Sequence, residues 1–325
     1  MLEPVRIQDV AVPAILVVAV FLVALVMPAL GAVIGIFSPV PLVYVYLQRG
    51  RETGLAGIVV VVLALLLFLG PRYGVFFLAE YGILAAILSE SIRFRLPFDK
   101  AALLGALGTS LSSGVLLFLA FSGEEGSLGD FLKEQVKGHL LQSLEALESV
   151  QKDGETLEVW DKKTIETLSG KLATSYPAFI FAGCMFASLV NYAASGFLWR
   201  HLRGDASYFS DRFSLWVLPE PLIWVFIFSG SLVWFLDSGA FYAVGLNVLI
   251  LSVVVYCLQG AAIAVYFLES KAIPVFLWIV LFLFVFTQPL LIGALIGIGV
   301  FDLWADFRKL KLKTFPESEK PGEEE

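Results

Sequence analysis

The sequence is dominated by long apolar stretches that recur along the whole chain and are separated by short polar segments. A helix needs about 20 mainly apolar residues to cross a bilayer. Only 16% of the 325 residues are charged, whereas a soluble domain carries roughly 25%. The sequence therefore predicts an all-α polytopic transmembrane helical bundle. It excludes a soluble enzyme, a nucleic-acid-binding protein and a disordered chain.

The candidate spans cover residues 10–27, 30–47, 55–70, 73–91, 101–121, 176–199, 215–236, 240–268, 273–287 and 289–304. Proline breaks a helix, and Pro28 and Pro289 each separate two of these stretches. Each proline fits either a hairpin tip or a kink within one tilted span. We therefore expect about eight to ten spans.

The basic residues indicate an orientation. Cytoplasmic loops are enriched in Lys and Arg. With the N-terminus inside, every basic residue outside the segment 122–175 falls on the cytoplasmic side, except for Arg72. A single span over 273–304 would put the basic tail and the Arg200–Arg212 loop on opposite sides, so we favour two spans there. We expect a multi-pass protein of the bacterial cytoplasmic (inner) membrane with both termini in the cytoplasm.

One long polar segment, residues 122–175, interrupts the apolar stretches. Leucine, valine and phenylalanine recur within it at helical spacing. This pattern predicts an extracytoplasmic α-helical hairpin between an N-terminal transmembrane bundle, residues 1–121, and a C-terminal one, residues 176–310. The hairpin either packs on itself or docks a partner. Residues 311–325 are rich in Pro, Glu, Ser and Lys, which predicts a disordered cytoplasmic tail.

The sequence contains no recognisable catalytic motif. It has no P-loop, no Gly-x-Ser-x-Gly, no His-Glu-x-x-His and no dinucleotide fingerprint. Two cysteines and two histidines argue against a disulfide framework and against a metal site with nitrogen and sulfur ligands. We therefore expect no enzyme activity, no cofactor and no bound metal.

Polar residues inside the apolar stretches are the best candidates for ligand binding. An ionisable group in hydrocarbon usually faces protein or water, and Glu80 has apolar residues on both sides. Glu80 is either a ligand contact in a central cavity or a buried carboxyl bonded to a neighbouring helix. The other candidates are the amides Asn191, Asn247 and Gln259, which alternatively bridge helices.

Rows of small residues predict close helix packing, since they let backbones approach each other. The rows are Gly31 with Gly35, Gly105 with Thr109 and Ser113, and Gly293 with Gly297. They either pack helices of this chain or present a face to another subunit.

Charged residues follow at the end of the last apolar stretch. Asp302 and Asp306 precede Arg308. Asp306 is close enough in sequence to pair with Arg308 or with the Arg200–Arg212 loop, which would pin the cytoplasmic end. A cytoplasmic docking site is the alternative.

Several motifs together resemble the YybS-like family of predicted bacterial membrane proteins, domain of unknown function 2232. The resemblance covers most of residues 10–310. It is carried by Tyr176-Pro177, Asn191-Tyr192, Phe213-Ser-Leu-Trp216, Leu218-Pro219-Glu220, Asn247, Gln259-Gly260 and the Gly299–Arg308 terminus. It implies a membrane fold and no settled biochemical activity.

The N-terminal half is also similar to substrate-binding components of energy-coupling-factor vitamin transporters and to related rod-shape accessory proteins. Pro39-Val-Pro41 and the glycine-punctuated run to Gly82 carry this similarity. It implies that the helices enclose a small solute near Glu80, and that Gly31 and Gly35 dock a coupling subunit. Those components usually have about six spans, and this chain has more, so the similarity is one of fold.

The sequence thus leads to two hypotheses about function. The first is a solute-binding or transport component whose partners are the lipid bilayer, a coupling subunit and ATPases. The second is a non-catalytic scaffold that holds cell-envelope or cell-shape assembly proteins. Polar residues converging on an open, wet pocket would favour transport, and pairwise burial would favour the scaffold.

Overall fold

The computed structural model describes residues 7–122, 127–150, 162–204, 208–209 and 212–310. These residues form helices joined by turns, with no strand among them. The predicted disordered tail, residues 311–325, lies outside the described part of the chain. The chain divides into two compact units, unit 1 from Met1 to Asp211 and unit 2 from Arg212 to Glu325.

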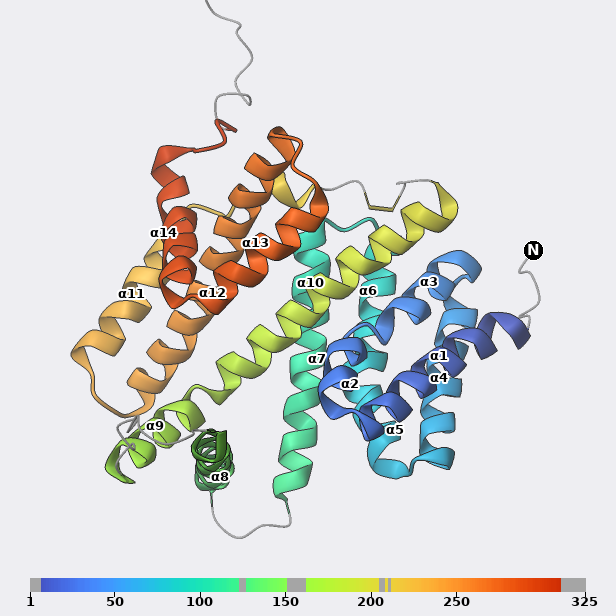
Figure 1. Cartoon of the computed structure of the whole chain (residues 1–325), viewed down its shortest axis with the longest axis horizontal. Helices are drawn as coiled ribbons and strands as arrows, with labels where there is room; N and C mark the ends of the chain where they lie inside the picture. Colours follow the sequence, from blue (N-terminus) through green and yellow to red (C-terminus); the bar gives the residue numbers. More distant parts are fainter. Residues whose placement is uncertain (1–6, 123–126, 151–161, 205–207, 210–211, 311–325) are drawn as a thin grey trace, which may run out of the picture. The chain divides into compact units, whose positions relative to one another are not determined.

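Unit 1 is an all-helical bundle (Figure 1). Its helices are α1 (Ile7–Val26), α2 (Pro28–Gly35), α3 (Pro39–Arg49), α4 (Arg51–Phe68), α5 (Pro71–Phe77), a π-helical turn (Leu78–Gly82), α6 (Ile83–Arg93), α7 (Phe98–Phe121), α8 (Leu128–Val150), α9 (Lys162–Thr174) and α10 (Tyr176–Arg203). Proline occupies the start of several helices, where its missing N–H is not needed. The π-helical turn joins α5 and α6 into one span, Pro71–Arg93.

Unit 2 begins with a short 3₁₀ turn at Phe213–Leu215. Its described residues then form α11 (Leu222–Phe235), α12 (Ala240–Ser270), α13 (Val275–Thr287) and α14 (Pro289–Ala305). Helix α12 packs against both α11 and α14. The axes of α13 and α14 are bent by 107° at the break before Pro289, which is the position where the sequence predicts a broken helix.

Within the described part of the chain, five helical segments are long and apolar enough to cross a membrane. They are Arg51–Phe68, Pro71–Arg93, Phe98–Phe121, Tyr176–Arg203 and Ala240–Ser270. Shorter apolar helices cover Val10–Val26, Val33–Arg49 and Leu222–Phe235, and the bent pair adds a broken span or a re-entrant loop. The chain is therefore an all-α polytopic membrane protein.

The division of the structure differs from the predicted one at α10. The sequence places the residues from 176 onward in a C-terminal bundle, whereas α10 belongs to unit 1. The reason is that α10 packs along α7 and α3. A Cβ atom on Gly105 would lie 2.3 Å from Ser188 Oγ, so the glycine lets these two helices approach closely.

The polar segment forms two helices that pack on each other. Helices α8 and α9 are in contact, with Leu132 and Ile165 buried and an ion pair of 3.3 Å between Lys133 Nζ and Glu166 Oε1. Helix α8 runs across the direction of α7 and is seen end-on in Figure 1. Helices α8 and α9 of the predicted hairpin thus pack on each other, and the predicted turn between them lies outside the described residues.

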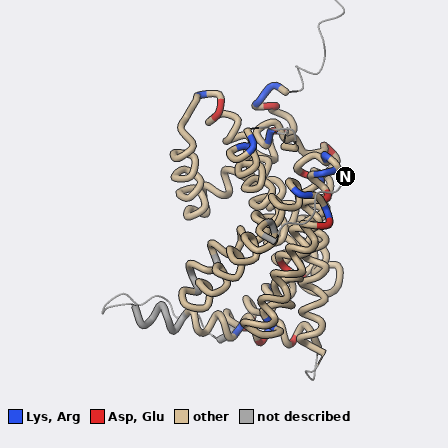
Figure 2. Tube along the Cα trace, turned by 90° about the vertical axis from the view of Figure 1, so that its right-hand side faces the viewer, with Lys and Arg blue, Asp and Glu red and all other residues tan. Residues whose placement is uncertain are grey.

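Large apolar side chains cover much of the surface. Helix α13 has no buried residue, and Phe276, Ile279 and Leu283 on it are each about two-thirds exposed. Figure 2 shows that charged residues gather near the ends of helices and that the lengths between them are almost free of charge. This distribution is what a lipid environment requires, because the hydrocarbon core cannot solvate charges.

Candidate functional site

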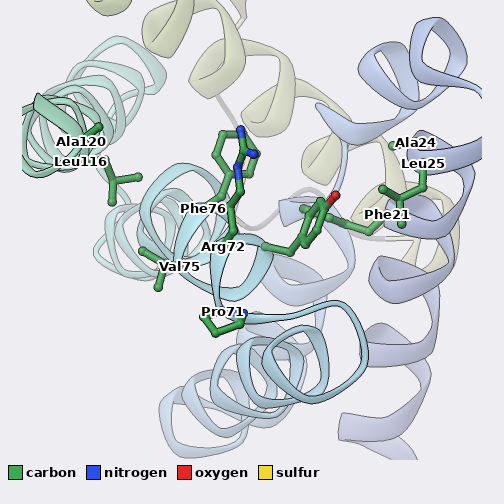
Figure 3. Close-up of a pocket in the computed structure, with 10 residues that line it drawn as sticks. Phe21, Ala24, Leu25, Pro71, Arg72, Val75, Phe76, Leu116 and Ala120 are labelled. Atoms are coloured by element: carbon green, nitrogen blue, oxygen red, sulfur yellow. The ribbon is translucent and has the colours of Figure 1, made fainter.

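A cavity with a volume of about 770 Å³ lies in unit 1. This volume lies within the range of ligand pockets, roughly 300–1,000 Å³. Helices α1, α5 and α7 form its wall, which consists of Phe21, Ala24, Leu25, Pro71, Arg72, Tyr73, Val75, Phe76, Leu116 and Ala120. Figure 3 shows Leu116 and Ala120 on one side of the α5 residues and Phe21, Ala24 and Leu25 on the other.

The turn between α4 and α5 positions this wall. Gly70 has a φ of 106°, a left-handed conformation that glycine adopts without strain. Pro71 then starts α5, and Gly74 lies so close to α4 that a Cβ there would be 2.5 Å from Leu66 Cγ. The first turn of α5, with Arg72 and Tyr73, is thereby held at the cavity.

Arg72 is the charged residue of the cavity wall. The described residues give it no ion pair, whereas Arg51 and Arg93 share Glu90 at 3.4 and 3.5 Å. Arg72 is also the residue that departs from the predicted charge distribution. This exception is the feature of the sequence that pointed to the cavity region, and it predicted no role for Arg72.

Glu80 lies in the π-helical turn and joins that turn to α7. Its Oε1 accepts a hydrogen bond of 2.6 Å from Ser113 Oγ, and Ser112 Oγ donates to the Ala79 carbonyl oxygen at 2.5 Å. The thiol of Cys184 on α10 lies close to the same pair. Glu80 is half-buried and does not belong to the wall of the large cavity.

Asn191 lies on α10, fully buried. Its Nδ2 donates to the Ile36 carbonyl oxygen and to the Ala187 carbonyl oxygen, both at 2.8 Å. The first bond reaches the break between α2 and α3, where helical hydrogen bonding is interrupted. Asn191 therefore connects α10 to this break. Among the described residues, Asn191 and Glu80 share no hydrogen-bond partner, so these contacts do not join them in one polar cluster.

Glu90 organises the end of unit 1 at which the basic residues gather. Tyr46 Oη donates to Glu90 Oε1 at 2.5 Å, and Arg51 and Arg93 pair with the same carboxylate. Trp199 on α10 packs against Tyr44 with ring centroids 5.8 Å apart. The ends of α3, α4, α6 and α10 thus meet where the sequence predicts cytoplasmic loops.

Unit 2 contains a buried charged network. Asp302 Oδ2 accepts hydrogen bonds from Gln259 Nε2 at 2.8 Å and from Arg308 Nη2 at 2.9 Å. Arg308 Nη1 donates to the carbonyl oxygens of Ser214 and Trp216 at 2.8 and 2.9 Å. A small cavity of about 80 Å³ adjoins Gln259 and Asp302. The network ties the 3₁₀ turn, α12 and α14 together.

The other predicted residues of unit 2 have local partners. Asn247 Nδ2 donates to the Ala243 carbonyl oxygen of its own helix at 2.8 Å. Asp306 Oδ1 accepts from the Leu310 amide at 2.9 Å, and the carboxylate that pairs with Arg308 is that of Asp302. Asn247 and Gln259 belong to unit 2, whereas Glu80 and Asn191 belong to unit 1.

Three of the predicted small residues pack within unit 1. A Cβ on Gly31 would lie 2.2 Å from Ala24 Cβ, and one on Gly35 would lie 3.7 Å from Tyr81 Oη. Gly105 meets Ser188 as described above. By contrast, Gly293 and Gly297 face open space.

The closest glycine crossing of unit 2 is between Gly260 and Gly299. A Cβ on Gly260 would lie 2.0 Å from the Leu295 carbonyl oxygen, and one on Gly299 would lie 2.0 Å from the Tyr256 carbonyl oxygen. The residues come from α12 and α14, so spacing within one helix does not reveal the pair. Among the residues that the structure covers, no group of three His, Cys, Asp or Glu side chains is placed to hold a metal ion.

Comparison with known proteins identifies the family of this chain. A family model described as predicted membrane protein (DUF2232) matches residues 14–303. The chain therefore belongs to this family, which confirms the first resemblance seen in the sequence. No curated protein and no solved structure matches the chain. The similarity to energy-coupling-factor components stays a prediction.

Proposed function

We propose that this chain is a membrane-embedded solute-binding component of a transport system. The observation that carries the proposal is the cavity of about 770 Å³ between α1, α5 and α7. Most of its wall is apolar and aromatic, with Arg72 and Tyr73 supplying polar groups, which is the usual composition of a small-molecule site. The proposal gives the chain no catalytic step.

The proposal includes a location and a partner. We place the protein in the bacterial cytoplasmic membrane with both termini in the cytoplasm, because the basic ends of α3, α4, α6 and α10 lie together. Since the sequence has no nucleotide-binding motif, energy would come from a coupling subunit with ATPases. Stoichiometric co-purification of such proteins from native membranes would support transport.

Extraction of bound molecules tests the cavity directly. We would purify the protein gently from native membranes, extract it with organic solvent and analyse the extract by mass spectrometry. Leu116→Trp fills the cavity from α7, and Leu111→Trp is the matched control because Leu111 lies on the same helix, is 72% exposed and lies outside the wall. A molecule recovered with the wild type and the control but lost from Leu116→Trp supports the proposal. Identical extracts from all three proteins would overturn it.

Membrane orientation is testable with single cysteines in a background without Cys184 and Cys257. Gln135 on α8 and Glu52 on α4 are both exposed. We expect Gln135→Cys to react with an impermeant maleimide added to intact cells. We expect Glu52→Cys to react only after the membrane is opened. The reverse pattern would place the termini outside the cytoplasm.

One observation favours a non-catalytic scaffold of envelope or cell-shape assembly as the second candidate. Glu80 is bonded to Ser113, Asn191 to Ile36 and Gln259 to Asp302, and this pairwise arrangement is what we expect of a scaffold. Co-purification of envelope-assembly proteins without an ATPase, together with a cavity that yields no bound molecule, would favour this role.

A further inference from the structure

The guanidinium of Arg72 indicates what kind of molecule the cavity binds. It is a charged group in a wall that is otherwise mostly apolar, and no described residue forms an ion pair with it. A guanidinium presents several donors in a fixed plane that match a carboxylate or a phosphate. An anionic group on the ligand would complete this part of the wall.

From the length of α4 we expect Arg72 at the level of the lipid headgroups. Helix α4 has 18 residues, from Arg51 to Phe68, and therefore spans about 27 Å. Arg51 is paired with Glu90 at one end, and Arg72 follows the other end by four residues. Because the hydrocarbon core is about 30 Å thick and α4 is one of the candidate spans, we expect Arg51 and Arg72 near opposite surfaces of the membrane.

The apolar part of the wall lies deeper than Arg72. Val75 and Phe76 follow Arg72 on α5 and are about one helical turn further along the span. Leu25, Val75 and Phe76 are 49%, 47% and 44% exposed, so the wall is accessible from outside the bundle. The cavity therefore offers a cationic group near the membrane surface and apolar surface toward the hydrocarbon.

We infer that the cavity binds an anionic amphiphile. Its carboxylate or phosphate contacts Arg72, and its apolar part lies against Phe21, Phe76 and Leu116. This inference rests on the proposed function and names the class of ligand for the same cavity. An anionic membrane lipid and a free amphipathic acid share this chemistry, so the experiment includes both.

Native mass spectrometry of the full chain in a non-ionic detergent tests the inference. Phosphatidylglycerol is compared with phosphatidylcholine of the same acyl chains, and dodecanoate with dodecanol. Arg72→Gln removes the charge and Arg72→Lys keeps it. Arg95→Gln is the matched control, because Arg95 is also exposed and lies outside the cavity wall. Thermal melting of each variant checks that it is folded.

We expect the wild type to bind the anionic member of at least one pair about tenfold or more tightly than the neutral member. Arg72→Gln should abolish that preference, Arg72→Lys should keep part of it, and Arg95→Gln should keep it fully. Preference for phosphatidylglycerol identifies a membrane lipid, and preference for dodecanoate alone identifies a free acid. Both outcomes support the inference.

Three other outcomes overturn it. In the first, the wild type binds anionic and neutral probes equally, and Leu116→Trp abolishes this binding. That result would refute an anionic ligand but would leave the proposed binding function intact. In the second, Arg72→Gln still prefers anionic probes over neutral ones, which would mean that another residue causes the preference. Absence of any binding by the folded wild type would also refute the inference, while the proposed function would still be judged by the extraction experiment.

Discussion

The two compact units hold their polar groups in different ways. In unit 1, Glu80, Glu90 and Asn191 have separate partners on separate helices. In unit 2, Asp302 and Arg308 form one buried network that also includes Gln259. The side chain of Arg308 is 0% exposed and that of Asp302 is 6% exposed.

This difference indicates which charges serve stability and which are available for function. A buried charge must be paired, since the cost of desolvating it otherwise exceeds what packing supplies. Arg308 satisfies that requirement within its own unit. Arg72 is exposed in the cavity wall, and no described residue forms an ion pair with it. The comparison therefore indicates that Arg308 serves stability and that Arg72 is available for the ligand binding proposed above.

The largest effect is expected from breaking the buried pair of unit 2. Asp302→Ala leaves the Arg308 guanidinium buried without its counter-charge, and we expect the free energy of unfolding to fall by about 3–5 kcal/mol. Thermal melting in detergent measures this loss. The double variant Asp302→Leu with Arg308→Met should recover much of it, because no unpaired charge remains. An unchanged melting temperature for Asp302→Ala would contradict the structural role of the network.

A smaller loss is expected at the glycine crossing of α12 and α14. Gly299→Ala would put a Cβ 2.0 Å from the Tyr256 carbonyl oxygen, and relieving such overpacking typically costs about 1–3 kcal/mol. Gly297→Ala is the matched control on the same helix, because nothing lies within 4 Å of its added Cβ. The melting temperature should fall for Gly299→Ala and stay unchanged for Gly297→Ala. Equal stability of the two would mean that the helices do not cross at Gly299.

The same crossing illustrates what could be predicted from the sequence. Apolar length and proline positions predict the helices well, because bilayer thickness and the missing proline donor act locally. The break before Pro289 and the helices α8 and α9 follow from such local rules. The pairing of Gly260 with Gly299 depends on how two distant helices approach, and the spacing of Gly293 and Gly297 suggests a packing face that the structure leaves open.

The candidate site shows the same limit. The charge distribution singles out Arg72 as an exception, but only the approach of α1 and α7 to α5 creates the cavity around it. Asp306 is nearer to Arg308 in sequence than Asp302 is, yet Asp302 pairs with Arg308. Asp306 has left-handed backbone angles after the end of α14, while Asp302, on the helix, is the residue whose carboxylate meets the returning guanidinium.

Unit 1 should respond less to the loss of its central amide. Asn191→Ala removes the hydrogen bond from Nδ2 to the Ile36 carbonyl oxygen. Side-chain hydrogen bonds within membranes average about 0.6 kcal/mol and reach about 1.7 kcal/mol, and we expect a loss in that range. Measuring the melting temperatures of Asn191→Ala and Asp302→Ala side by side compares the two losses of stability directly. A loss as large as that of Asp302→Ala would mean that unit 1 also depends on one buried polar centre.

The smallest effect is expected from Glu80→Gln, and it decides between the two interpretations of this residue. The amide oxygen of glutamine can still accept the hydrogen bond that Ser113 Oγ donates at 2.6 Å, so the contact between the π-helical turn and α7 should survive. Because Glu80 lies outside the cavity wall, we expect the affinity for the cavity's ligand to change by less than about threefold, equivalent to about 0.6 kcal/mol. Native mass spectrometry measures the ligand affinity of Glu80→Gln and of Arg72→Gln in the same experiment. If Glu80→Gln abolished binding while the protein stayed folded, Glu80 would be a ligand contact, as the sequence suggests, and the ligand would extend beyond the wall around Arg72.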